Sequence, residues 1–390
     1  MPRILAIDWD RLEARALVLH AGATGSSIVG AWAVPLAEDG GATSKQVSAK
    51  LSAALAGEVS GRMTTLVAVG REQVQMVLLS LPPAPPDELP EMVRFQADRE
   101  LTSLGAGAAL DFIPLSGDAT TSHQVLAAAL AAGGLAEVAE VCLALDVEAD
   151  RITLRATAAA AFVARSLAAG RDEVTLVVNR LTDEADLTVL VDDQVVLVRT
   201  VRLPDASEAA ARQKALAGEI RRTVAAVRQQ LGEKQVGRVM LCGNSSEAAE
   251  ATALADDLKL PVEMFDVAEH APAGIVRSSL SKDSLARFAA VLGMALGESD
   301  RRAPVLDFLH VRRRTETKKF TRTHALAAVA AAVIVLAYAL ILWQRAAAPA
   351  RELARVNTEL ASVRKQIEQY QPVLDDATAI ELWQATDVNW

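Results

Sequence analysis

The sequence predicts an α/β protein of two similar lobes, followed by one membrane-spanning helix and a short coiled coil. Three observations support this prediction: a pattern of strands and a helix that occurs twice, a long uncharged run near the C-terminus, and an apolar repeat beyond that run. With 390 residues, the chain is too long for one ordinary domain and long enough for two or three units.

The doubled pattern consists of three strands, a helix and a fourth strand, and its copies begin about 170 residues apart. We expect the first copy at Arg3–Ile7, Ala14–His20, Ser27–Val34, Ser44–Leu55 and Thr65–Val69. We expect the second copy at Val174–Val178, Ala185–Val191, Gln194–Val201, Ser207–Leu231 and Arg238–Cys242. Such alternation is typical of an α/β fold, and its duplication predicts two lobes that face a cleft.

An extra unit lies between the two copies. We expect it to contain a helix at Asp87–Leu101, a strand at Gln124–Ala129, a helix at Leu135–Leu145 and a strand at Asp150–Leu154. The first apolar run stops at Asp8, which is too early for the core of a signal peptide. We therefore predict a cytoplasmic domain over residues 1–300, with an inserted subdomain over 79–155.

Composition excludes several classes of function. The formal net charge of −9 argues against a protein that coats nucleic acid. Cys142 and Cys242 each lie in an apolar run, which predicts buried free thiols rather than a disulfide or a metal pair. The sequence contains no phosphate-binding GxxxxGK[ST] loop, no G-x-S-x-G elbow and no histidine at metal-ligand spacing. We therefore expect no catalytic residue and no metal site from these motifs.

The run Ala325–Trp343 contains neither a charge nor a strongly polar side chain. As a helix it would be roughly 28 Å long, close to the thickness of a bilayer core. Six Lys or Arg residues lie in the fifteen positions before this run, and three lie in the fifteen after it. The excess predicts a cytoplasmic N-terminal side. We expect a basic linker over 301–324, a transmembrane helix over 325–343, and a stalk over 344–390 on the other side.

The stalk carries apolar residues in alternating steps of three and four, at Leu353, Val356, Leu360, Val363, Ile367 and Tyr370. This spacing is typical of the a and d positions of a coiled coil. It predicts pairing with a second copy or with a similar partner, although a solitary amphipathic helix is the alternative. We expect Pro372 to end the helix. Because the chain stops soon afterwards, we expect that a C-terminal domain is lacking or that the chain is a fragment.

Several stretches resemble a known family. Leu79–Leu101 and Ala109–Leu115 read LSLPPAPPDELPEMVRFQADREL and ALDFIPL, and Asp283–Glu298 reads DSLARFAAVLGMALGE. Together with the doubled strand order, they resemble the actin-like ATPase superfamily, and within it PilM of type IV pilus assembly and GspL of type II secretion. The resemblance implies an actin-like fold with two RNase H-like lobes.

A further stretch, Val305–Arg313, reads VLDFLHVRR. It resembles the I-N-L-L-P-x-R motif that begins PilN, with Asp307 in place of Asn and His310 in place of Pro. The chain therefore resembles a PilM-like domain fused to a PilN-like stalk, which is the layout of GspL. The resemblance covers essentially the whole chain. It implies that Leu306, Phe308 and Leu309 pack onto the chain's own domain, as the PilN motif does on PilM.

The resemblance also implies three nucleotide-binding motifs, which this sequence alters. The first hairpin keeps Asp8, but Asp10 stands where a glycine would let backbone approach phosphate. The second motif has Asn179 in place of an aspartate and lacks its glycine. The third keeps Gly243 but has Asn244 instead of a second glycine. We therefore expect no cofactor, or only weak binding of ATP and Mg²⁺ at Asp8, Asp10, Asn179, Gly243 and Asn244.

The function that follows is an inner-membrane assembly-platform scaffold of a type IV pilus or a type II secretion system. Its expected partners are the membrane proteins of that platform, without nucleic acid. An active actin-like ATPase, small-molecule kinase or nucleotide switch is the alternative. A membrane-tethered cell-division protein of the actin family is less favoured, because such proteins usually attach by a terminal amphipathic helix. The sequence does not distinguish pilus from secretion system.

Overall fold

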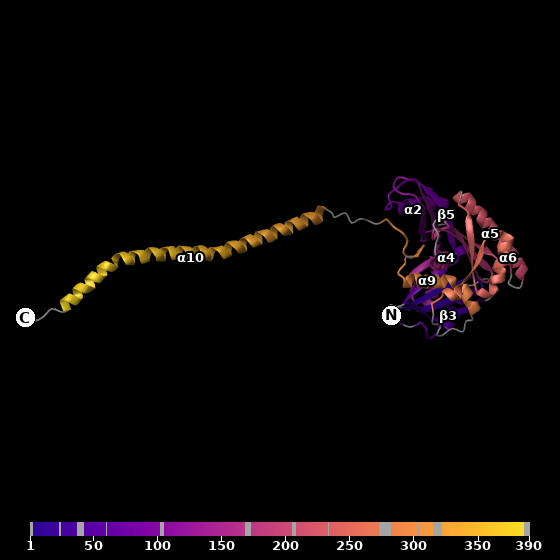
Figure 1. Cartoon of the computed structure of the whole chain (residues 1–390), viewed down its shortest axis with the longest axis horizontal. Helices are drawn as coiled ribbons and strands as arrows, with labels where there is room; N and C mark the ends of the chain where they lie inside the picture. The colour runs from indigo at the N-terminus through magenta and orange to yellow at the C-terminus, as the bar shows by residue number, and fades with distance from the viewer. Residues whose placement is uncertain are drawn as a thin grey trace, which may run out of the picture. The chain divides into compact units, whose positions relative to one another are not determined.

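The computed structural model describes residues 3–22, 25–36, 43–59, 61–101, 105–167, 173–204, 208–232, 234–272, 282–302, 304–314 and 322–385. The chain divides into two compact units, Met1–Thr315 and Glu316–Trp390. The first unit contains three sheets and the helices that cover them, and the second is formed by one helix (Figure 1).

The first lobe is built on a five-stranded sheet in the order β3-β2-β1-β4-β8. Its strands are β1 (Arg3–Trp9), β2 (Glu13–Gly22), β3 (Gly25–Pro35), β4 (Met63–Val69) and β8 (Arg151–Leu154). β1 pairs antiparallel with β2 and parallel with β4. β1 is buried along almost its whole length, which explains its nearly continuous apolar sequence.

The second lobe repeats this arrangement in the order β11-β10-β9-β12-β13. Its strands are β9 (Val174–Arg180), β10 (Glu184–Val191), β11 (Gln194–Arg202), β12 (Val236–Gly243) and β13 (Val262–Asp266). Again the first strand pairs antiparallel with the second and parallel with the fourth. The predicted duplication is therefore confirmed, and the equivalent hairpins β1–β2 and β9–β10 begin the two lobes.

A three-stranded sheet, in the order β5-β7-β6, lies between the two copies in sequence. It consists of β5 (Val74–Leu81), β6 (Ala109–Ser116) and β7 (His123–Leu130). Helix α2 (Leu89–Glu100) shares a hydrophobic core with these strands. Because β5 begins at Val74 and β8 pairs with β4 of the first lobe, this separate sheet occupies residues 74–130 rather than 79–155. Helix α3 (Ala132–Ala144) packs against α1 (Ser44–Ala54) of the first lobe.

Two helices pack closely at the centre of the domain. α9 (Ala289–Ser299) contacts β1 and β2 of the first lobe, and α4 (Arg155–Ser166) contacts β10 and β11 of the second. A Cβ atom at Gly293 would lie 2.1 Å from the backbone oxygen of Ala158, so only glycine permits this approach. This close packing joins the two lobes through their helices.

Most predicted elements lie within a few residues of the observed ones, but several were missed. Among them are β5, α4, α6 (Ala248–Leu258) and β13. Helix α4 reads RATAAAAFVARS and is buried on nearly every side, so it lacks the apolar stripe that reveals a surface helix. The other α-helices that the structure describes in the first unit are α5 (Ala209–Leu231), α7 (Val267–His270) and α8 (Lys282–Leu285).

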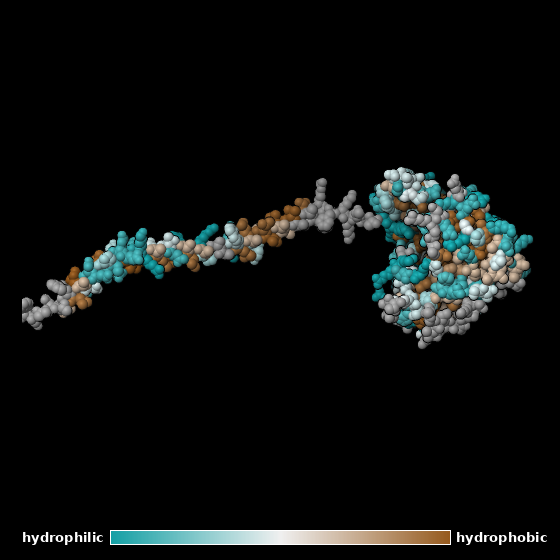
Figure 2. Space-filling view, in the orientation of Figure 1, coloured by the Kyte–Doolittle hydropathy of each residue, from teal (hydrophilic) through white to brown (hydrophobic). Residues whose placement is uncertain are grey.

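The second unit contains the single helix α10 (Arg322–Ala385), in which Figure 2 shows stretches of apolar residues in brown. It is the one helix of the described chain that is long and apolar enough to cross a membrane, with a mean hydropathy of 1.9 in its most apolar window. The expectation that Pro372 ends the helix is wrong, because α10 continues to Ala385. Proline removes one hydrogen bond, and the flanking turns continue the helix around it. Coiled-coil pairing of α10 stays a prediction.

Candidate functional site

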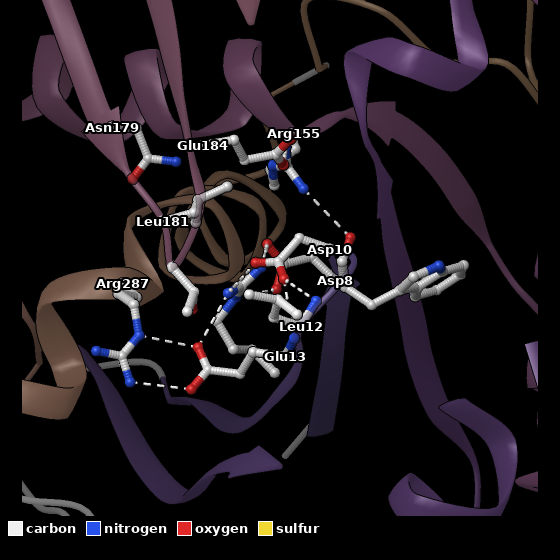
Figure 3. A network of polar contacts seen from close by, with 12 residues as sticks. Asp8, Asp10, Leu12, Glu13, Arg155, Asn179, Leu181, Glu184 and Arg287 are labelled. Carbon is white, nitrogen blue, oxygen red and sulfur yellow. Dashed lines mark hydrogen bonds and ion pairs between the residues drawn. The ribbon is translucent and has the colours of Figure 1, made fainter. Parts of the chain in front are cut away.

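The candidate site lies where the β1–β2 and β9–β10 hairpins meet (Figure 3). The guanidinium of Arg11, in the first turn, pairs with the carboxylate of Asp183, in the second, at 2.8 Å. Arg155, at the start of α4, donates to the carbonyl oxygen of Trp9 at 3.2 Å and to Asp186 on β10 at 2.9 Å. The two hairpins are therefore bridged by arginine side chains.

Within the first hairpin, three carboxylates surround the buried guanidinium of Arg15. Its Nε lies 2.7 Å from Asp8, and its Nη1 lies 2.8 Å from Asp10 and 3.0 Å from Glu13. Burial raises the pKa of Asp8, although the charge of Arg15 opposes this shift. Burial also opposes ionisation of Asp10, but Arg15 and the turn's N–H groups lower the pKa of Asp10 below its usual value.

The second hairpin has a comparable arrangement, with its cation supplied by another element. Arg155 is fully buried and pairs with both Glu184 and Asp186. Burial raises the pKa of Glu184 to about 7, and the nearby Asp186 adds to this shift while Arg155 opposes it. Asn179 lies beside Asp186, 3.4 Å from its Oδ2, and within the described residues its own Oδ1 is buried without a hydrogen-bond partner.

The third predicted motif lies at the end of β12, where Gly243 could leave space for a ligand. That space contains side chains of the chain itself: a Cβ at Gly243 would lie 2.5 Å from Glu247 and 2.9 Å from Arg180. Arg180 in turn pairs with Glu247 at 2.5 Å and with Glu250 at 2.6 Å. Asn244 caps the following turn by accepting the N–H of Ser246 at 2.7 Å. Gly243 lines a cavity of about 630 Å³, but the position directly over its Cα is occupied by the side chains of Glu247 and Arg180.

These contacts do not fit a metal and phosphate group. Asp8, the retained carboxylate of the first motif, and Asp10, which stands at its glycine position, already share the guanidinium of Arg15. The described residues contain no group of three or more side chains arranged to hold a metal ion. A phosphate beside Asp10 would meet an anion whose positive partner is already in use. The predicted residues Asp8 and Asp10 do lie together, but Asn179 faces Asp186, and Gly243 and Asn244 belong to a separate turn.

A second site lies where the end of the domain folds back as the segment Pro304–Arg314. Leu306 and Phe308 are buried, and the N–H of Phe308 donates to the carbonyl of Ile152 on the edge strand β8 at 2.8 Å. Leu309, which was predicted to pack with them, is 40% exposed. The N–H groups of Leu309 and His310 donate to Oδ1 of Asp307, so the chain bends at Leu309 and its side chain does not join the two buried anchors.

Charged groups fix this docked segment on both sides. Asp307 pairs with Arg151 at 3.0 Å, and its N–H donates to the buried carboxylate of Asp111 on β6. Arg312 also reaches Asp111, at 2.7 Å, and lies over the ring of Phe112. Residues 303 and 315–321 of the predicted linker lie outside the described residues. The segment therefore joins the three-stranded sheet to the first lobe.

Several of these residues were not predicted as site residues. Arg15 and Glu13 interrupt an apolar strand, and Arg155 precedes a run of alanines. Each is therefore a charged residue in an apolar stretch, and all three are buried in the structure. The sequence offered a clearer signal for Asp111, because it is the one charged residue in the apolar stretch ALDFIPL, directly before Phe112. The two cysteines are buried and free, as predicted, and burial raises the thiol pKa of Cys142 to about 11 and of Cys242 to about 12.

Comparison with known proteins identifies the fold. A scan against protein-family models and a search of curated proteins gave no match for this sequence. The structure is similar to a chain of the PilM-PilN type IV pilus biogenesis complex, with a TM-score of 0.62 and 20% identity over 75% of this chain and 97% of that chain. It also matches the cytoplasmic domain of EpsL from the type II secretion system of Vibrio cholerae, with a TM-score of 0.43 and 13% identity over 79% and 98% of the two chains. The predicted actin-like, PilM-like fold is confirmed.

Proposed function

We propose that the chain is an inner-membrane scaffold of a type IV pilus or a type II secretion system. Its actin-like domain would dock cytoplasmic partners, and α10 would carry it in the membrane with the N-terminal side in the cytoplasm. The fold shared with a chain of the PilM-PilN complex supports this assignment. The excess of Lys and Arg before residue 325 supports the orientation.

The docked segment is the observation that carries the proposal. A peptide with two buried apolar anchors, Leu306 and Phe308, is held against a strand edge by one backbone hydrogen bond and by ion pairs to Arg151 and Asp111. Addition of an extended peptide to a sheet edge is a common mode of protein recognition. The domain binds the segment that leads to its own apolar helix α10. This arrangement suits a scaffold that positions other proteins better than it suits an enzyme.

The cleft contacts support a domain that needs no nucleotide. Asp8 and Asp10 both pair with Arg15, and Arg180 occupies the space beside Gly243. In this proposal the altered motifs leave a cleft whose charged side chains are already paired with one another. The apolar seam from Leu353 to Tyr370 is exposed on α10, and we propose that it pairs with a second copy or with a similar stalk.

Replacing Phe308 tests the proposal. Phe308→Asp should release the segment, because burial of such a side chain contributes about 1.5–3 kcal/mol and a buried carboxylate adds a further penalty. In the detergent-solubilised full chain, trypsin should then cleave after Arg312, Arg313 and Arg314 much faster. Leu309→Asp is the matched control, since Leu309 is 40% exposed, and it should leave cleavage unchanged.

Equal cleavage of the two variants would contradict docking of the segment. In the organism that encodes the chain, its deletion should abolish surface pili or secretion, and Phe308→Asp should fail to restore them. The assembly that is lost identifies which system the scaffold serves. Normal pili and normal secretion after deletion would contradict the scaffold role.

An active ATPase or nucleotide switch of the same fold is the alternative. The retained Asp8 favours it, because that carboxylate has the residue type expected of a cation ligand. Titration of the full chain with Mg-ATP in a calorimeter separates the two functions. Saturable heat that Asp8→Ala abolishes would favour the alternative, and no heat from a folded chain would favour the scaffold.

A further inference from the structure

A small cavity lies between helices α4 and α9, which pack side by side (Figure 1). Its volume is about 130 Å³, and its walls are mainly apolar. The wall residues come from β4, α4, α9 and the docked segment, and they include Leu66, Ala158, Met294, Gly297, Pro304 and Val305. A cavity of about 150 Å³ with apolar walls is large enough to bind benzene. The space therefore fits a compact apolar body of about that size.

Gly297, in the last turn of α9, keeps part of this space open. A Cβ at Gly293, one turn earlier, would lie 2.1 Å from the backbone oxygen of Ala158, so packing requires that glycine. A Cβ at Gly297 would meet no described atom within 4 Å, and its helical backbone suits any residue. Glycine is less favourable than alanine inside a helix. Contacts within the described chain therefore do not explain Gly297, whereas an occupant of the cavity would.

The solvent side of the cavity is basic. Arg165 and Arg302 both line it, and their side chains are partly and largely exposed. The two guanidiniums share one carboxylate, since Arg165 pairs with Asp300 and Arg302 lies 3.9 Å from it. Arg151 and Glu298, which also line the cavity, pair with each other at 2.9 Å. Two cations with one carboxylate between them can accept a second carboxylate.

We propose that this cavity binds a small apolar carboxylate, with the apolar body beside Gly297 and the carboxylate at Arg165 and Arg302. Because Pro304 and Val305 line the cavity, the bound molecule contacts the start of the docked segment. Its binding therefore stabilises the docked state of that segment. The ligand site goes beyond the scaffold function, and only its coupling to the segment rests on the proposed function.

Calorimetric titration of the detergent-solubilised full chain with benzoate tests the site. The wild type should bind benzoate saturably, and it should bind benzyl alcohol, which has the ring without the charge, several-fold more weakly. Gly297→Leu places a side chain in the cavity and should weaken benzoate binding by about tenfold or more. Gly297→Ala adds one methyl group to the same helix position and should bind benzoate nearly as the wild type does.

Two results would overturn the site. Equal heats from the wild type and Gly297→Leu would mean that benzoate enters only the detergent. Equal affinity for benzoate and benzyl alcohol would exclude recognition of a carboxylate. If Gly297→Leu does not fold, Ala161→Leu takes its place, because Ala161 lines the cavity from α4. Unchanged benzoate binding by folded Ala161→Leu would overturn the site equally.

Trypsin tests the coupling to the docked segment. Saturating benzoate should slow cleavage after Arg312, Arg313 and Arg314 in the wild type and leave the rate unchanged in Gly297→Leu. Saturable binding without slower cleavage would overturn the coupling, and so would equal slowing in the two chains. The titration does not depend on docking or on any secretion or pilus function. Failure of the ligand site would therefore leave the scaffold proposal standing, and failure of the Phe308→Asp test would leave the titration valid.

Discussion

The cleft between the β1–β2 and β9–β10 hairpins and the docked segment Pro304–Arg314 are both bridged by contacts within the chain, but different forces stabilise the two. In the cleft, Arg15 and Arg155 are fully buried, and each pairs with at least two carboxylates. At the docked segment, the buried groups are mainly the apolar anchors Leu306 and Phe308, and Arg151 and Arg312 are both partly exposed.

The difference in burial indicates which of the two sets of contacts can change during function. A buried ion pair is expensive to break, because each separated charge loses both its partner and its hydration. A docked peptide with two apolar anchors and partly exposed ion pairs can leave its site at a lower cost. We therefore expect the buried ion pairs of the cleft to stay formed and the docked segment to be able to exchange.

The largest effect should come from breaking the cleft at Arg155. Arg155→Met leaves Glu184 and Asp186 buried without their cation, which should lower the free energy of unfolding by about 3–5 kcal/mol. Arg11→Met is the control, because Arg11 also bridges the hairpins but its side chain is 45% exposed, and it should cost about 1 kcal/mol or less. Urea denaturation of the full chain in detergent measures both. Similar losses from the two variants would remove the distinction between buried and exposed bridges.

A smaller effect should appear as a pH dependence of the cleft. Folding raises the pKa of Glu184 from 4.5 to about 7, so the folded chain binds more protons between these values and the free energy of unfolding falls as pH rises. The loss is at most about 3.5 kcal/mol, at about 1.4 kcal/mol for each unit of pKa. Glu184→Gln should abolish this slope between pH 5 and 7.5 in urea denaturation. The lowered pKa of Asp10 acts only at more acidic pH.

Retention of the full slope in Glu184→Gln would assign the pH dependence to another group, of which Asp8 is the first candidate because its pKa is also raised. Circular dichroism at both ends of the pH range controls for a change in fold. Cleavage of the docked segment by trypsin should not follow this slope, since Glu184 lies in the other site.

The sequence predicted the architecture well because the lobes repeat one pattern. Periodicity and the duplication sufficed for the doubled sheet, and the uncharged run sufficed for a helix that could span a membrane. Helix α4 could not be predicted, because it is enclosed by both lobes and its alanines have no polar face. Strand β13 is short and only partly buried, so its pattern is weak.

The sequence showed that the nucleotide-binding motifs are altered, but it did not predict the ion pairs that form in their place. The loss of glycine at Asp10 was visible in the sequence, and so was the loss of a carboxylate at Asn179. The pairing of Arg15 with Asp8 and Asp10 depends on the register of β1 against β2, which places Arg15 opposite Asp8. That Arg155 would reach the second hairpin depends on contacts between segments far apart in the chain, which no local pattern records.

The smallest effect should come from weakening the docked segment at Asp111. Asp111 is buried and accepts hydrogen bonds from the N–H of Asp307 and from the guanidinium of Arg312. Asp111→Asn keeps the shape but loses the charge, so it should shift the docking equilibrium by about 1.5–3 kcal/mol, the usual contribution of hydrogen bonds to a charged group. Trypsin cleavage after Arg312 should accelerate accordingly.

Glu91→Gln is the matched control, because Glu91 pairs with Arg314 at 3.1 Å but both side chains are largely exposed, and it should change cleavage little. Global unfolding of Asp111→Asn in urea should shift by less than that of Arg155→Met. If Asp111→Asn instead lowered global stability without faster cleavage, the docked segment would be as permanent as the cleft. Both sites would then act as structural closures, and exchange of the segment with a partner would have to be abandoned.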